Sequence, residues 1–282
     1  MTRKRFLELR RPEACKILAA RILHNCENTI SLIEFCALND IEHYRLSSSL
    51  FPLVGERECG VTLANLGIEK EVVKTLRVAG ELAKIYGITL SSHPSQYITL
   101  FSGSPNTVAN SITDLEMHGF LHDSIGLAAD HSNPINIHPT GGVVGAEEIF
   151  GTNFARCSQS VRKRLVLENC DKGEWSCKQL FEFSRRFFEN RQIRIPLTYD
   201  NLHDQCLPSL DDNDYADLFK ITWGGRPIFH WSEGGKNGKI RSHVDYFSHL
   251  PDVVRRNTDV TWECEVKAKD AAIKKAKKEF DL

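Results

Sequence analysis

Residues 164–204 read RLVLENCDKGEWSCKQLFEFSRRFFENRQIRIPLTYDNLHD. A short apolar run at 164–168 leads into a helical pattern that begins near Ser176, and a second apolar run follows at 195–200. Short apolar or β-branched runs separated by longer helical patterns are typical of βαβ units around a parallel sheet. The segment therefore predicts an α/β fold with parallel strands.

The same alternation extends over the chain, whose 282 residues are close to the roughly 250 that a (β/α) barrel occupies. Apolar runs predict seven strands, at 41–47, 87–92, 134–138, 164–168, 195–200, 227–230 and 259–265. Helical patterns begin near Pro12, Ile68, Asn106, Ala146, Ser176, Asp211, His243 and Lys267. We therefore expect one (β/α) TIM barrel domain over residues 1–282, with 268–282 forming a basic helix and tail.

The amino-terminal end departs from the barrel pattern. A barrel with eight helices should open with a strand before the first helix, yet only a charged stretch, residues 1–9, precedes Pro12. We expect this stretch to be a poorly defined stub and the first strand to be missing or degenerate.

Composition narrows the class of protein. The formal net charge of −1, from 36 basic and 37 acidic side chains, lacks the basic excess that would by itself indicate a nucleic-acid binder. Nine cysteines without CxxC pairs argue against a disulfide framework and against a thiolate zinc site. The sequence contains no apolar window of membrane-spanning length and no signal-peptide pattern. We expect a cytoplasmic monomer with no membrane partner.

Polar side chains follow nearly every predicted strand at its carboxyl end. In a barrel these ends meet at one mouth, where barrel enzymes place their catalytic groups. We therefore expect several side chains to lie within reach of one another, with His243 joining them from the start of a helix. The strand-end residues are His93, His138, Glu168, Asp200, His203, His230 and Glu265.

A cluster of this kind predicts bound metal. A single histidine of this kind is more often an ordinary half-buried side chain. Seven such residues at one mouth indicate a shared function. Carboxylates and imidazoles buried together are costly unless cations pair with them. Nitrogen and oxygen ligands without thiolates suit manganese, zinc or iron(II), and there are enough of them for two or three ions. Two or three ions bound close together can hold a phosphate ester and activate water. We therefore expect phosphodiester hydrolysis.

The motifs HYRLSSSLFP, SSHPSQYITLF, INIHPTGG, LVLENCD, DNLHD, HWSEG, RSHVDY and ECEVKAKD occur in this order. Together they resemble the UV damage endonuclease family, a relative of endonuclease IV and of xylose isomerase-like barrels. The resemblance implies a DNA repair endonuclease that needs no nucleotide cofactor. Such an enzyme nicks damaged double-stranded DNA immediately 5′ to cyclobutane dimers, 6-4 photoproducts and other distorting lesions, using two or three ions, Mn²⁺ by preference and zinc as an option.

The resemblance also assigns roles to residues. It implies metal binding by His93, His138, Glu168, Asp200, His203, His230, His243 and Glu265, with Glu168, Asp200 and Glu265 positioning water and phosphate. It implies that Gln96 and Tyr97 insert into the duplex at the lesion, where a ring can replace lost base stacking. It suggests a DNA contact for Arg45, although an ordinary ion pair would equally explain this residue. Lys267 follows Glu265, and from that position it could contact either DNA phosphate or the carboxylates at the mouth.

Two positions differ from the family pattern. Where the family has a metal-site histidine after the SSLFP turn, this chain offers Glu56, which we include among the expected ligands. Two residues before His230, where the family usually carries a lysine near the metals, this chain has Ile228. We expect the second difference to affect catalytic rate or metal preference.

Two alternative functions remain open from the sequence. A metal-dependent sugar isomerase or epimerase would use the same barrel with similar strand-end residues, and it would have a small closed pocket. A lesion-binding sensor would keep the metals and the inserting pair but would not cleave DNA. Nicking of irradiated DNA distinguishes the endonuclease from both.

Overall fold

The computed structural model describes residues 1–235 and 240–282, which fall into two compact units. Unit 1 comprises Met1–Ile98, Ala109–Ile135 and Arg156–Arg164, and unit 2 comprises Thr99–Val108, Asn136–Ala155 and Leu165–Leu282. The strands are β1 (His43–Leu46), β2 (Thr89–Ser92), β3 (Ile135–Ile137), β4 (Leu165–Glu168), β5 (Leu197–Thr198), β6 (Ile228–Ser232) and β7 (Thr261–Glu265).

The helices are α1 (Arg3–Glu8), α2 (Arg11–Leu38), α3 (Glu69–Ile85), α4 (Pro105–Ile125), α5 (Ala146–Ala155), α6 (Gln159–Arg162), α7 (Cys177–Arg191), α8 (Asn201–Cys206), α9 (Tyr215–Lys220), α10 (Asp252–Arg256) and α11 (Lys269–Phe280). None of the helices in the described part of the chain has the length and apolar character needed to cross a bilayer.

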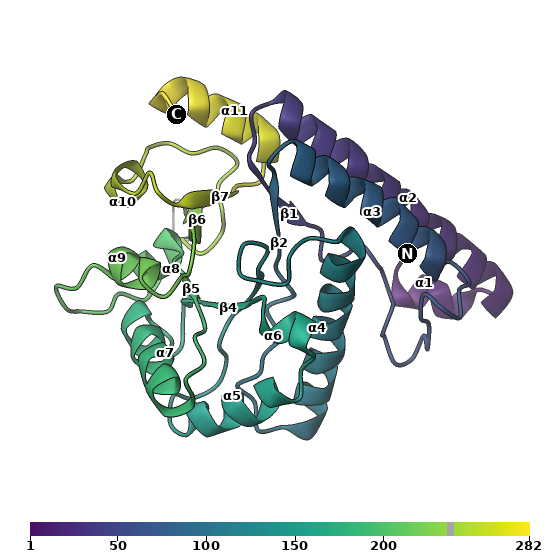
Figure 1. The fold of residues 1–282 in the computed structure, drawn as a ribbon, viewed down its shortest axis with the longest axis horizontal. Helices are drawn as coiled ribbons and strands as arrows, with labels where there is room; N and C mark the ends of the chain where they lie inside the picture. The colour runs from purple at the N-terminus through teal and green to yellow at the C-terminus, as the bar shows by residue number, and fades with distance from the viewer. Residues whose placement is uncertain (236–239) are drawn as a thin grey trace. The chain divides into compact units, whose positions relative to one another are not determined.

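Unit 1 is built on parallel strands covered by long helices. Strand β1 pairs in parallel with β2 from His43 opposite Thr89 to Leu46 opposite Ser92, and Ser92 in turn pairs with Ile135. Figure 1 shows α2 and α3 side by side. Proline stands in the first turn of α2, where a missing N–H costs nothing. The buried faces of these helices form the core of the unit, with Leu18, Ile22, Val72 and Leu76 fully buried.

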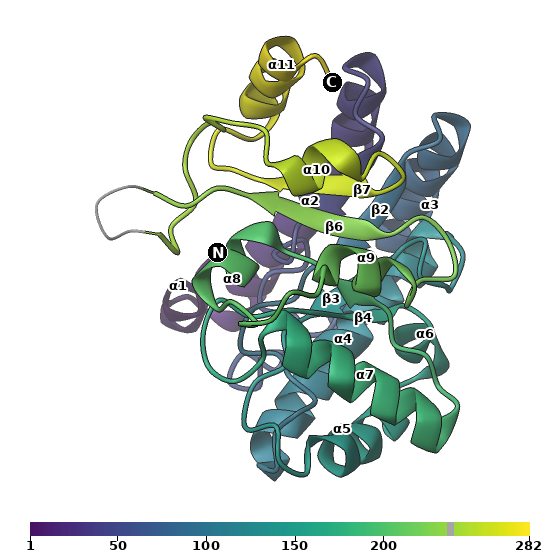
Figure 2. The ribbon, with the colours of Figure 1, turned by 90° about the vertical axis from the view of Figure 1, so that its left-hand side faces the viewer.

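Unit 2 contains the carboxyl-terminal strands. Strand β4 pairs in parallel with β5, and an isolated parallel bridge joins Asp200, just after β5, to His230 of β6. Strands β6 and β7 lie side by side in Figure 2 and pair along their whole length, from Ile228 opposite Thr261 to Ser232 opposite Glu265. Burial of apolar surface holds these strands against the helices around them.

Two apolar clusters hold the helices of unit 2. In the first cluster, Phe150 of α5 makes edge-to-face contacts with Phe183 and Phe187 of α7, and these two rings stack on each other. In the second cluster, Trp231 of β6 stacks on Phe247 with ring centroids 3.8 Å apart, and Ala272 and Ala276 of α11 pack against the same group. Aromatic pairs of this kind add to the stabilisation from area burial.

A strand begins within each of the seven apolar runs, and within the described residues no strand precedes β1. Most strands are shorter than predicted, most of all at 195–200, where only Leu197–Thr198 is a strand. The exception is β6, which continues past the predicted end at His230 to Ser232. Residues 1–9, for which we expected no defined element, include helix α1. Pairing ends early after β5 because Asp200 caps the short helix α8, which the sequence pattern did not reveal.

The prediction of a helix beginning near His243 is wrong. Residues 240–251 form no helix, and the next helix is α10, which begins at Asp252. The helix-like spacing of Val244, Phe247 and Leu250 has another cause, because all three side chains pack into the cluster around Trp231 from an irregular segment. The helix expected near Asp211 begins later, at Tyr215, after the capping residue Asp214.

Candidate metal centre

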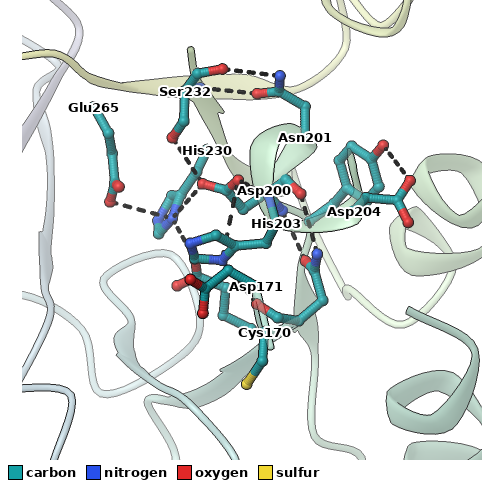
Figure 3. A network of polar contacts seen from close by, with 12 residues as sticks. Cys170, Asp171, Asp200, Asn201, His203, Asp204, His230, Ser232 and Glu265 are labelled. Carbon is teal, nitrogen blue, oxygen red and sulfur yellow. Dashed lines mark hydrogen bonds and ion pairs between the residues drawn. The ribbon is translucent and has the colours of Figure 1, made fainter. Parts of the chain in front are cut away.

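The strand ends of unit 2 bring carboxylates and imidazoles together (Figure 3). Glu168 is the last residue of β4, Asp200 follows β5, and Glu265 is the last residue of β7. His230 lies in the middle of β6 and His203 lies in the first turn of α8. Five predicted ligands thus come from neighbouring parallel strands or from the turn that follows one of them.

Two asparagine side chains fix how these strand ends meet. Asn169, directly after Glu168, donates from Nδ2 to the carbonyl of Asp200 at 3.1 Å and accepts from the Asp200 amide at 2.8 Å. Asn201 makes the same pair of bonds with the carbonyl and the amide of Ser232, at 2.9 and 2.8 Å. Each carboxamide takes the place of a backbone partner, so the chain stays in register where the strands end.

Glu168 is the centre of the first group of possible ligands. Its carboxylate is fully buried, yet Oε1 lies 3.0 Å from Nδ1 of His230 and 3.1 Å from Nδ1 of His203. Oε2 lies 3.7 Å from Nε2 of His138 and accepts from Asn136 at 2.5 Å. One ligand atom each from His138, Glu168 and His203 lies within 4.8 Å of the others. Such a group could hold a divalent ion.

Asp200, His230 and Glu265 form a second group, also within 4.8 Å. Nδ1 of His230 lies 3.4 Å from Glu265 and 3.9 Å from Asp200. Both oxygens of Asp200 are held, since Oδ1 accepts from the His203 amide and Oδ2 accepts from the Ser232 hydroxyl, each at 2.8 Å. The second group therefore presents two oxygens and one nitrogen from a rigid frame, a donor set that suits a divalent cation.

His243 reaches the second group from a loop. Nε2 of His243 lies 3.5 Å from Glu265, and an antiparallel bridge joins His243 to Gly234. The bridge needs glycine at 234, because a Cβ there would lie 2.0 Å from the Ile240 carbonyl oxygen. The amide of Lys267 also donates to the carbonyl of Val244, which ties the loop to the chain after β7.

Burial and mutual charge set the protonation of the site. Burial alone would raise the pKa of Glu168, but His230, His138 and His203 hold it well below its usual range. Burial raises the pKa of Asp200, opposed by His203. Burial would lower the pKa of His203, yet Asp200, Glu168 and Glu265 raise it to about 11. Without a metal, an imidazolium thus supplies the positive charge that the carboxylates require.

Unit 1 carries most of the other residues that the sequence singled out. His93 follows β2 and its Nδ1 lies 3.0 Å from the carbonyl of Pro94. Gln96 and Tyr97 are exposed at the centre of a turn that the Ile98 amide closes onto the carbonyl of Ser95 at 2.8 Å. Tyr97 has 76% of its surface exposed, which is unusual for a tyrosine.

Arg45 lies in β1 opposite Ser91. The Glu56 carboxylate accepts from the Cys59 amide at 3.0 Å, and this bond helps to lower the pKa of Glu56 against the effect of burial. Among the described residues, Glu56 belongs to no close group of possible metal ligands. In unit 2, Lys267 contacts the Ser242 hydroxyl at 3.4 Å, and Ile228 is buried at the start of β6.

Glu263 is a residue that the sequence reasoning missed. It is buried in β7 opposite His230, and its Oε1 lies 3.6 Å from Nε2 of that imidazole. The ECE motif held part of the signal, because residues two apart in a strand face the same side. Glu263 must therefore point to the side of β7 from which Glu265 reaches His230.

Parallel strands alternating with helices, and strand ends that gather imidazoles and carboxylates, define a (β/α) barrel protein with a candidate metal site. The chain belongs to the UV-endonuclease UvdE family, whose model matches residues 1–281. A UV DNA damage endonuclease of Nostoc sp. is 29% identical, over 97% of this chain and 83% of its own length. The chain is therefore a member of a nuclease family.

Solved structures agree with this assignment. The crystal structure of SacUVDE matches with a TM-score of 0.78 and 27% identity, covering 100% of this chain and 91% of that one. Endonuclease IV from Thermus thermophilus matches with a TM-score of 0.59 over 90% of this chain and 93% of its own, at 12% identity, and so shows the fold alone. The predicted fold class, a TIM barrel of the xylose isomerase-like kind, is confirmed.

Proposed function

We propose that this protein is a DNA repair endonuclease that hydrolyses the phosphodiester immediately 5′ to ultraviolet photoproducts in double-stranded DNA. The observation that carries the proposal is the fully buried Glu168 carboxylate, which lies within 4 Å of three imidazoles in a chain of the UvdE family. Six other carboxylate or imidazole side chains of the same unit lie close to it or to each other: His138, Asp200, His203, His230, His243 and Glu265.

These residues fit divalent metal. A dry structural core would not place Glu168, Asp200 and Glu265 around the same histidine, since like charges in a buried site repel. We propose that His138, Glu168 and His203 hold one ion, and that Asp200, His230, His243 and Glu265 hold another. The nitrogen and oxygen donors suit Mn²⁺, with zinc as the alternative. The ions would activate water and stabilise the charge of the phosphate.

The protein's own residues would hold the metal ligands in place. Asn169 and Asn201 keep the strand ends in register, while Ser232 and the His203 amide orient the Asp200 carboxylate. Pre-oriented ligands keep the reacting groups aligned without a cost at the moment of reaction. We propose Glu168, Asp200 and Glu265 as the carboxylates that position water and phosphate.

The turn that carries Gln96 and Tyr97 supports a role in finding the lesion. Two exposed side chains at the centre of a closed turn can enter a duplex without unfolding their own backbone. A tyrosine ring can stack where a distorted base pair has opened, and the amide can take up a vacated pairing edge. We propose that this pair inserts at the lesion, that His93 serves as a further metal ligand, and that Arg45 and Lys267 contact phosphate.

The test is nicking of a fluorescent duplex that carries one cyclobutane dimer, with and without added Mn²⁺. We expect metal-dependent cleavage immediately 5′ to the dimer by the wild-type protein and none by Glu265→Ala. The control is Glu189→Ala, which removes a half-exposed carboxylate that pairs with Arg185 one helical turn away. Tight binding of the lesion without a nick would identify a sensor and overturn the proposal.

A further inference from the structure

We propose that Glu263 is a positioning residue that holds the Nε2 proton of His230, so that Nδ1 is the nitrogen presented to metal. The inference rests on the proposed function, because it concerns the same metal centre. It adds a residue and a defined imidazole tautomer to that centre.

The pairing of β6 with β7 places the two residues together. His230 is directly opposite Glu263 in the parallel register, and both side chains are buried, with 2% and 8% of their surface exposed. Oε1 of Glu263 lies 3.6 Å from Nε2 of His230. This separation is longer than a hydrogen bond, and it places the carboxylate beside the Nε2 edge of the ring.

The other ring nitrogen faces a different set of partners. Nδ1 of His230 lies 3.0 Å from Glu168, 3.4 Å from Glu265 and 3.9 Å from Asp200. Carboxylates therefore lie at both nitrogens of one buried ring: the candidate ligands meet at Nδ1, and Glu263 stands at Nε2. The Nδ1 edge of the ring therefore faces the candidate metal ligands, and the Nε2 edge faces Glu263.

Imidazole chemistry makes this arrangement directional. A neutral imidazole carries its proton on one nitrogen and its lone pair on the other. A ligating histidine commonly donates its second N–H to a carboxylate, which fixes the ring and makes the ligating nitrogen more basic. Glu263 is placed to accept that proton, which leaves the Nδ1 lone pair directed at the group formed with Asp200 and Glu265.

The first test uses the wild-type protein loaded with zinc, a diamagnetic probe metal, with ¹⁵N-labelled histidine. We expect the His230 resonances to show a protonated Nε2 and a metal-bound Nδ1, the assignment being made by their disappearance in His230→Gln. A metal-bound Nε2 would overturn the proposal, because Glu263 would then be beside the ion itself.

The second test measures zinc affinity by competition with a chelating dye. Glu263→Leu removes the acceptor, and we expect a roughly 10- to 100-fold loss of affinity. Glu263→Gln keeps an acceptor oxygen, so its loss should be smaller. The matched control is Cys264→Ala, the next residue of β7, whose side chain packs toward Trp231 and α11. Affinities of the Leu and Gln variants within about twofold of the control would overturn the proposal.

The outcomes separate this inference from the proposed function. Wild-type protein that binds zinc and nicks lesion DNA, but ligates through Nε2, would refute the role of Glu263 alone. Wild-type protein that binds neither zinc nor Mn²⁺ would refute the metal centre, and with it both proposals.

Discussion

Asn169 binds the main chain of Asp200 at both its carbonyl and its amide, with bonds of 3.1 and 2.8 Å. Because Asn169 directly follows Glu168, this one side chain links two of the carboxylates of the candidate metal centre. Asn201 repeats the arrangement with Ser232, whose hydroxyl in turn donates to Asp200. The main chain at these strand ends is thus held by amide side chains, which carry no charge to compete for a cation.

Replacement of Asn169 by aspartate should break this link. In Asn169→Asp a carboxylate oxygen would face the Asp200 carbonyl, and a buried acceptor would be left without a donor. We expect the free energy of unfolding to fall by about 1–3 kcal/mol and zinc affinity to fall with it, measured by urea denaturation and dye competition. Asn213→Asp, at an exposed position, is the control. Equal stability of the two variants would argue against the link.

The loop that carries His243 depends on glycine at 234. In Gly234→Ala the new Cβ would lie 2.0 Å from the Ile240 carbonyl oxygen, so the backbone must move and take His243 away from Glu265. We expect the variant to remain folded and to bind zinc at least several-fold more weakly. Gly225→Ala meets no atom within 4 Å and should bind like the wild type. A Gly234→Ala protein with wild-type affinity would remove His243 from the centre.

Metal binding should release protons. The carboxylates around His203 raise its pKa to about 11, so in the metal-free protein the ring is protonated at neutral pH, and an ion must displace that proton. We expect zinc affinity to increase by up to about tenfold per pH unit between roughly pH 6 and 8 for each proton released. Calorimetry in buffers of different ionisation enthalpy measures the number released. Affinity independent of pH would contradict this account of His203.

Unit 1 should lose stability in acid because of two buried histidines. Burial, aided by nearby positive charges, lowers the pKa of His118 to about 4 and that of His122 to about 3. In the unfolded chain the pKa of each histidine is about 6.5. As the pH falls from about 6.5 towards these folded values, the two histidines become protonated in the unfolded chain but stay neutral in the folded chain. The free energy of unfolding therefore decreases.

Each histidine should contribute up to about 1.4 kcal/mol per pH unit in this range. His122 of α4 contacts the Ser92 hydroxyl of β2 at 3.1 Å, so His122→Gln can keep a polar contact while it removes the titrating group. We expect the difference in unfolding free energy between pH 7 and pH 5 to be smaller in this variant. The reverse, or no change, would show that His122 is not the source.

The sequence predicted the elements and ligands that depend on periodicity. The carboxyl-terminal parts of the strands could be located from apolar runs, so Glu168, Asp200, His203, His230 and Glu265 were placed together in advance, although His230 lies within β6 and not at its end. Local pattern failed where distant contacts decide the structure. Val244 and Phe247 have helical spacing, but packing on Trp231 and the bridge from Gly234 to His243 hold the segment as a loop.

Two parts of the site could not be predicted from motif positions alone. Asn169 lies beside Glu168 in the sequence, but its role appears only when β4 and β5 are paired. Glu263 needed the register between β6 and β7, because a shift of one residue would turn it away from His230. Both residues contact a metal ligand only because of how the strands pair, and a single sequence does not specify that pairing.

The most direct test of the central claim is a titration of metal-stripped protein with Mn²⁺, in which bound metal and nicking of a duplex with one cyclobutane dimer are measured on the same samples. We predict no cleavage in the stripped protein, cleavage that rises in step with bound metal, and, in Asp200→Asn, loss of cleavage together with loss of the ion assigned to Asp200, His230, His243 and Glu265. Cleavage by the stripped protein in excess chelator, or full metal binding by Asp200→Asn, would contradict the account.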